Sequence, residues 1–263
     1  VGWREAWQWL AVGAVLVVIP LSFVMRRSPE DHGLHPDGKS AEEIAAGGGA
    51  RAAADFASSM TRAEALRTRV FYLTVFAFGL GGLSIGMILI NGIPYMEDAG
   101  FSSTTAALMI TLASIPSMLT KPVWGYFLDR LDARVVAVIG FVLTAGALVA
   151  IVVTVNARAD HLVYVAFFAL GTGWGGFLPL QEVIWATFFG RRYLGAVRSA
   201  GMPFALGLSA TAPVATAYYF DRVGDYDGAF LMVAFLALVA VLLISFARPP
   251  TRPERAEESA AGS

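Results

Sequence analysis

A lysine lies inside one of the most apolar stretches of this chain, where a charge is costly. The stretch "SMLTKPVWGYFLDR" covers residues 117–130, and Lys121 stands seven residues before Leu128, its last apolar residue. In a helix that rises about 1.5 Å per residue, the backbone of Lys121 lies about 10 Å from that end. A charge at the centre of a membrane helix costs about 2.5 to 3.5 kcal/mol, and such groups usually face a polar cavity or a partner. The chemistry that Lys121 offers is electrostatic attraction of an anion.

The neighbours of Lys121 on the same helical face are small or polar. Positions 114, 117 and 125, which share this face, hold Ser114, Ser117 and Gly125. Such a narrow strip is suited to lining the path of a polar solute. In the alternative interpretation, the long side chain of Lys121 reaches the nearby lipid headgroups and binds no solute.

Glu182 is the only acidic residue well inside another apolar stretch, and it also lies seven residues before the end of that stretch, at Phe189. The similar depth makes an ion pair between Lys121 and Glu182 possible, which would lower the cost of both buried charges. In one interpretation Glu182 releases Lys121 to an arriving anion or takes up a proton that is coupled to its movement. In the other, the ion pair is purely structural.

Few other residues offer chemistry. Asn91 and Trp174 could line a cavity, although tryptophans in apolar segments more often pack or anchor at an interface. The chain lacks Gly-x-Ser-x-Gly and His-Glu-x-x-His motifs, and its histidines (His32, His35 and His161) stand outside the apolar stretches. We therefore expect no catalytic residue, no metal site and no cofactor, which argues against an enzyme.

The composition sets the class of protein. Of 263 residues, 57% are hydrophobic and only 15% are charged, which is typical of a protein embedded in the lipid bilayer. The formal net charge of −1 gives no basic field that would attract nucleic acid. About 20 apolar residues are needed for one helical membrane span. Seven such stretches are present, near residues 7–25, 70–93, 104–128, 135–156, 162–189, 200–220 and 228–247.

Two polar segments lie outside these seven spans, one after the first span and one after the last. The segment 26–69 is long, polar and rich in Gly and Ala, which predicts a linker, and Thr61 with Glu64 predicts a capping box that begins a short helix near its end. Most arginines fall on one side if the first span enters from outside, so the positive-inside rule places the linker and the tail 248–263 in the cytoplasm. The composition of the tail predicts disorder.

Polarity also recurs among the spans. The first, fourth and seventh are almost featureless, whereas the others hold the glycines, prolines and polar side chains. A plain helix at every third position is what three-helix repeats with one peripheral helix each would produce, an arrangement known in transporters.

Several stretches are similar to a known family, the major facilitator superfamily of secondary transporters. The stretch "GYFLDRLDAR" at 125–134 resembles its Gly-x-x-x-Asp-Arg-x-x-x-Arg cytoplasmic loop, and "FFGRRYLGAVRSAG" at 188–201 with "YYFDRVGDYDGAF" at 218–230 resembles the connections around its eleventh helix. The stretches "SPEDHGLHPDG" at 28–38 and "TKPVWG" at 120–125 resemble the monocarboxylate porter and oxalate/formate antiporter branch.

The resemblance implies an all-α membrane protein of seven transmembrane helices. Residues 1–25 would form the last helix of an N-terminal bundle that is otherwise missing, and 26–69 a cytoplasmic linker. Residues 70–247 would form the six-helix C-terminal bundle of two three-helix repeats, followed by the tail 248–263. About five helices upstream would then be absent from this sequence.

The resemblance also implies a function. Such a protein moves a small organic anion, a monocarboxylate or dicarboxylate, across the membrane by alternating access, as a symporter or antiporter that can carry a proton with it. In that branch a cation on the eighth helix binds the carboxylate, and Lys121 occupies the matching position, whereas Ser117 stands where some relatives have an aspartate. Asp129 and Arg130 would latch neighbouring helices in one state of the cycle. We expect the inner membrane of a bacterium; the alternative is a transporter-like receptor or scaffold without transport activity.

Overall fold

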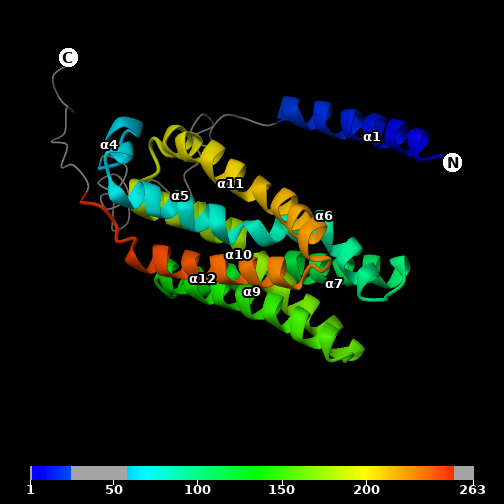
Figure 1. Cartoon of the computed structure of the whole chain (residues 1–263). Helices are drawn as coiled ribbons and strands as arrows, with labels where there is room; N and C mark the ends of the chain where they lie inside the picture. The colour runs from blue at the N-terminus through cyan, green and yellow to red at the C-terminus, as the bar shows by residue number, and fades with distance from the viewer. Residues whose placement is uncertain (1, 25–57, 252–263) are drawn as a thin grey trace, which may run out of the picture. The chain divides into compact units, whose positions relative to one another are not determined.

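The computed structural model describes residues 2–24 and 58–251, and all regular elements in these ranges are α-helices (Figure 1). The helices are α1 (Trp3–Val24), α4 (Arg62–Leu66), α5 (Arg69–Gly81), α6 (Leu83–Asp98), α7 (Ser103–Leu119), α8 (Lys121–Leu128), α9 (Ala133–Asn156), α10 (Asp160–Phe189), α11 (Leu194–Val223) and α12 (Asp227–Phe246). The all-α prediction is thereby confirmed for this part of the chain.

The chain separates into two compact units, Val1–Ala54 and Asp55–Ser263. The described part of the first unit is the apolar helix α1, and the second unit holds the remaining helices. Most of the predicted linker 26–69 and most of the tail 248–263 lie outside the described residues. The end of the linker is described, and there the Thr61 side chain accepts from the Glu64 backbone N–H while Glu64 accepts from the Thr61 backbone N–H, which confirms the capping box.

Five helical segments of the described chain are long and apolar enough to cross a membrane: Arg4–Val24, Arg69–Asp98, Ala133–Asn156, Asp160–Phe189 and Asp227–Phe246. The pair α7 and α8, bent by 40°, makes a sixth if it counts as one span. The remaining predicted span, 200–220, lies within α11, whose 30 residues reach about 45 Å but are less apolar. Seven spans are thus compatible with the structure.

Two of the predicted spans are broken. The second divides into α5 and α6 at Gly82, and the third divides into α7 and α8 at Thr120. Pro122 explains the second break, because a proline has no N–H for the carbonyl one turn earlier and disfavours helical geometry in the residue before it. Lys121 is that preceding residue, so the break determines where its ammonium group lies.

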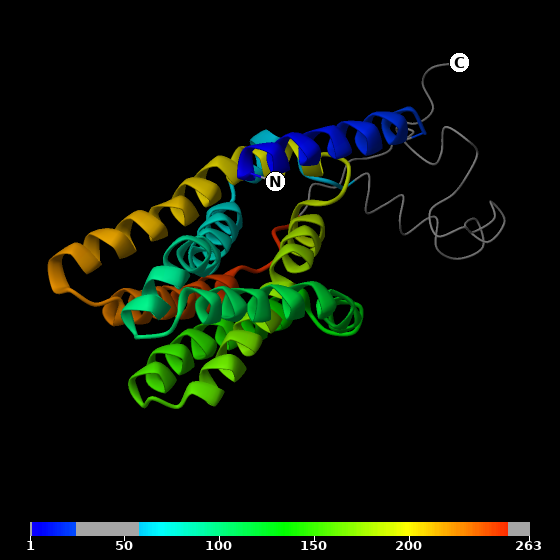
Figure 2. The same ribbon diagram turned by 90° about the vertical axis from the view of Figure 1, so that its right-hand side faces the viewer.

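The second unit packs α9 against both α10 and α12, while α11 lies against α5 and α6 (Figure 1). In the view of Figure 2, α11 meets α12 at the left, α9 lies at the bottom, and α10 rises from the bottom toward the top. The buried side chains form two apolar clusters, one around Met109, Phe167 and Phe230 and the other around Phe71, Phe78 and Phe189.

Glycines on α10 bring it close to the α7–α8 break. A Cβ atom at Gly171 would lie 1.9 Å from the carbonyl oxygen of Ala113, and one at Gly175 would lie 2.2 Å from the Thr120 hydroxyl. A Cβ atom at Gly176 would lie 2.6 Å from the ring of Trp124. The "GTGWGG" stretch, whose four-residue spacing indicates close helix approach, therefore packs against the broken span.

We predict that Gly171→Ala destabilises the protein by about 1 to 3 kcal/mol, because the new methyl group collides with a backbone carbonyl that cannot move without shifting α7. Thermal unfolding of the detergent-solubilised protein, followed by tryptophan fluorescence, measures the effect. Gly146→Ala on α9 is the control, since a Cβ atom there meets nothing within 4 Å. Equal melting temperatures for the two variants would contradict the close packing.

Candidate functional site

Lys121 is the first residue of α8, and its side chain is exposed on the bundle formed by the second unit. Within residues 2–24 and 58–251 its ammonium group has no hydrogen bond and no ion pair. The negative end of α7 and the positive end of α8 meet at Thr120, so the two helix dipoles largely offset each other there. The unpaired ammonium group itself favours a negatively charged ligand at this position.

The backbone around Lys121 is fixed by hydrogen bonds to α10. The indole Nε1 of Trp124 donates to the carbonyl oxygen of Thr172 at 2.8 Å, and the Thr120 hydroxyl lies 3.5 Å from the same oxygen. The Thr120 hydroxyl also donates to the carbonyl of Pro116 at 2.8 Å. Lys121 thus stands between two anchored residues. Sequence reasoning missed both anchors, although a tryptophan four residues beyond a threonine beside a proline break is a detectable signal.

The polar strip beside Lys121 is only partly open. Ser114 is exposed and its hydroxyl donates to the carbonyl of Ile110 at 3.0 Å, while Ser117 is half-buried where α7 approaches Gly175. The break at Thr120 also interrupts the regular helical spacing between Ser117 and Lys121. The strip therefore does not continue as one straight helical face.

Glu182 pairs with a different cation from the one that the sequence suggests. Its carboxylate forms an ion pair with Arg198 of α11, and the described structure shows no pair with Lys121. The side chain of Glu182 is 47% exposed and that of Arg198 is 22% exposed. The expectation that Lys121 and Glu182 meet is therefore wrong for this structure.

The reason lies in the hairpin that joins α10 to α11. Gly190 ends α10 with a φ of 83°, a conformation that glycine adopts without strain. Glu182 precedes Gly190 by eight residues and Arg198 follows it by eight, so antiparallel helices bring the two to the same level. This equal spacing is the sequence signal for the pair, although Arg198 falls just outside the predicted span 200–220.

Asn91 and Trp174 lie inside the bundle. Asn91 on α6 is 6% exposed, and its Oδ1 atom has no hydrogen-bond partner in the structure. The indole Nε1 of Trp174 on α10 donates to the Ser84 hydroxyl of α6 at 3.1 Å. Neither side chain is exposed beside Lys121, so the structure does not gather the four predicted binding residues into one open site.

Asp129 and Arg130 end α8 without pairing with each other. Asp129 is the exposed C-cap residue, and the guanidinium group of Arg130 lies 3.6 Å from the ring centroid of Tyr126. The neighbouring Asp132 instead caps α9, and its hydrogen bonds with Arg134 hold the pKa of its carboxyl group below the usual range. In the described residues Asp129 has no ion-pair partner.

A polar cluster that sequence reasoning missed joins three helix ends. These are the C-terminal ends of α6 and α9 and the N-terminal end of α12. The carboxylate of Asp227 accepts from the Tyr95 hydroxyl at 3.1 Å and from the Asn156 amide at 2.6 Å. Arg158, at a φ of 53°, donates to the carbonyl of Ala99 at 2.9 Å beside a polar cavity of about 240 Å³. These contacts fasten three helix ends. In the described ranges, no three Asp, Glu or His side chains gather closely enough to hold a metal ion.

Comparison with known proteins gives the family. A model of the Major Facilitator Superfamily matches residues 1–197 and 74–263, two overlapping stretches that together cover the chain. No curated protein is similar enough to the chain to count as a relative. With its apolar helices, the match makes this chain an integral membrane protein whose relatives transport small solutes and are not enzymes. The chain belongs to the major facilitator superfamily of secondary transporters.

Proposed function

We propose that this transporter carries a small organic anion, a monocarboxylate or dicarboxylate, by alternating access, and that Lys121 binds the carboxylate. The observation that carries the proposal is the exposed Lys121 ammonium group, which has no partner in the described residues although the backbone of Lys121 lies about 10 Å from the end of a predicted span. An unpaired charge at this depth is costly, and a negatively charged solute would offset part of that cost.

The other predicted binding residues take supporting roles in this proposal. Ser117 offers a hydroxyl group one turn before Lys121, where some members of the proposed monocarboxylate and oxalate/formate branch have an aspartate. The unsatisfied Oδ1 of Asn91 and the indole of Trp174 are buried in this structure, and they would reach the solute only when α6 and α10 move apart. Buried polar atoms without partners are costly, so a second state that satisfies Asn91 is physically reasonable.

Coupling to protons is assigned to Glu182 in this proposal. A proton on its carboxylate would remove the ion pair with Arg198 and free that guanidinium group between α10 and α11. Asp129 and Arg130 would act as the latch at the inner ends of the helices. The arginine distribution supports a cytoplasmic C-terminus, and we propose the inner membrane of a bacterium as the location.

We predict that Lys121→Ala lowers saturable carboxylate uptake by about a hundredfold, because removing one partner of a buried charge pair costs several kcal/mol. The measurement is uptake of radiolabelled monocarboxylates and dicarboxylates into liposomes that contain the purified full-length protein. Lys121→Arg keeps the charge and should retain part of the activity.

Arg62→Ala, which removes an exposed cation from α4, is the matched control for the loss of one positive charge. All variants must show the same elution volume and melting temperature as the wild type. Normal uptake by Lys121→Ala would remove the lysine from the mechanism. If no carboxylate is taken up by the wild type, a receptor or scaffold without transport becomes the better interpretation.

We predict that Glu182→Gln abolishes the stimulation of uptake by an acidic outside pH but leaves exchange of labelled for unlabelled solute measurable. The amide cannot take up or release a proton, whereas exchange does not need net proton movement. Uptake with and without an imposed pH gradient, in the same liposomes, separates the two activities. Glu97→Gln on the exposed end of α6 is the control. Full gradient-driven uptake by Glu182→Gln would exclude Glu182 from coupling.

A further inference from the structure

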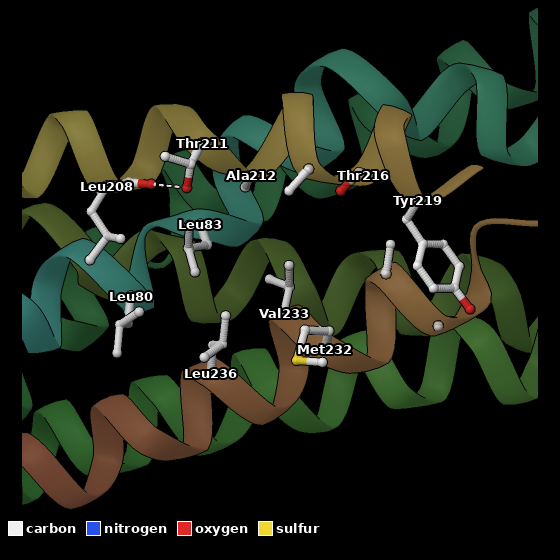
Figure 3. Close-up of a pocket in the computed structure, with 13 residues that line it drawn as sticks. Leu80, Leu83, Leu208, Thr211, Ala212, Thr216, Tyr219, Met232, Val233 and Leu236 are labelled. Atoms are coloured by element: carbon white, nitrogen blue, oxygen red, sulfur yellow. Dashed lines mark hydrogen bonds between the residues drawn. The ribbon is translucent and has the colours of Figure 1, made fainter. Parts of the chain in front are cut away.

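A cavity of about 200 Å³ lies between α11 and α12, with α5 and α6 behind it (Figure 3). Leucines from three of these helices line one half of it, namely Leu80, Leu208 and Leu236. The hydroxyl of Thr211 points back to its own helix and donates to the carbonyl of Leu208 at 2.7 Å (Figure 3). Water needs two to four polar partners to occupy a cavity, so this one is better suited to an apolar guest.

The cavity opens on the side of the bundle. Met232, which lines it on α12, is 57% exposed, and Thr211 and Ala215 on α11 are exposed as well. Ala215 is the small residue that leaves room on the α11 side, whereas the Tyr219 hydroxyl occupies the space beside Gly228, 2.1 Å from the place of a Cβ atom. Along a membrane span, the medium that reaches such an opening is the hydrocarbon of the bilayer.

The position of the cavity along α11 matches one leaflet. It extends from Tyr219 to Leu208, eleven residues that cover about 16 Å, which is close to half of a hydrocarbon core of about 30 Å. Leu208 lies at the middle of the helix Leu194–Val223. Tyr219 lies near the helix end, where tyrosines and arginines commonly mark the headgroup level.

A cation stands at the headgroup end of the cavity. The guanidinium group of Arg222 lies 4.8 Å from the ring centroid of Tyr218, one turn beyond the residues that line the cavity, and its side chain is exposed. A lipid phosphate is attracted to such an arginine and can accept paired hydrogen bonds from its guanidinium group. Arg222 and the apolar cavity thus follow one another along α11 as the headgroup and the acyl chain do in a phospholipid.

We propose that this cavity is a binding site for a membrane phospholipid, with one acyl chain between α11 and α12 and its phosphate at Arg222. The bound acyl chain fills the space that α11 and α12 leave open and packs against the α5–α6 break. The site is separate from Lys121 and does not depend on the proposed anion transport.

The test uses phosphatidylglycerol with a photoactivatable diazirine in the middle of one acyl chain. The full-length protein in lipid nanodiscs is illuminated and the labelled peptides are identified by mass spectrometry. We expect labelling of the segments around Leu208 and Leu236. Ala215→Trp fills the cavity and should lower this labelling about tenfold, because the acyl chain loses its buried contacts.

Ala217→Trp is the matched control, since it places the same side chain on an exposed position of α11 outside the cavity lining, and it should leave the labelling unchanged. Ala215→Leu, a smaller filling, should give an intermediate decrease if Ala215→Trp assembles poorly. Arg222→Gln should lower labelling when phosphatidylglycerol is present at limiting concentration. Equal labelling in Ala215→Trp and Ala217→Trp, labelling spread evenly over all exposed helices, or displacement of the label by a transported carboxylate would overturn the proposal.

Discussion

The close approach of α10 to the break between α7 and α8 is the contact on which the arrangement around Lys121 depends. A proline break leaves a backbone carbonyl without its helical donor, which a membrane tolerates only inside protein or beside a wet cavity. Gly171, Gly175 and Gly176 allow α10 to cover this break, and Thr172 offers the carbonyl that Trp124 uses. Larger residues on α10 would move the break away from its support and Lys121 with it.

The charged residues of the bundle fall into two groups, those that have a partner nearby and those that have none among the described residues. Glu182 with Arg198, and Asp132 with Arg134, have partners nearby, and Asp227 accepts from Tyr95 and Asn156. Each of these groups connects two helices or fixes a helix end, so its desolvation is offset within the structure. Among the described residues Lys121 and Asp129 both lack an ion-pair partner, and only Lys121 lies well inside a predicted span, which supports the role that we propose for it.

The same membrane environment explains the apolar cavity and the polar breaks. Helices that carry glycines, prolines and hydroxyl groups cannot pack as evenly as plain ones, and the irregular helices α5, α6 and α11 surround the cavity. The plain helix α12 closes one side of it. Irregular packing therefore leaves a space between α11 and α12, which we propose is filled by lipid, whereas α9 packs closely against α10 and α12.

The sequence alone determined the helical class and most span positions, because burial of about 20 apolar residues per span leaves a strong local signal. It also placed the capping box at Thr61, which depends on neighbours in sequence. Only the tertiary structure decided that Arg198, and not Lys121, pairs with Glu182, and that Asp227 joins three helix ends. Such pairs depend on how antiparallel helices align in space. In the sequence, two cations at a similar depth on different helices have the same chance of pairing with Glu182, and only the packing of the helices decides which of them is the partner.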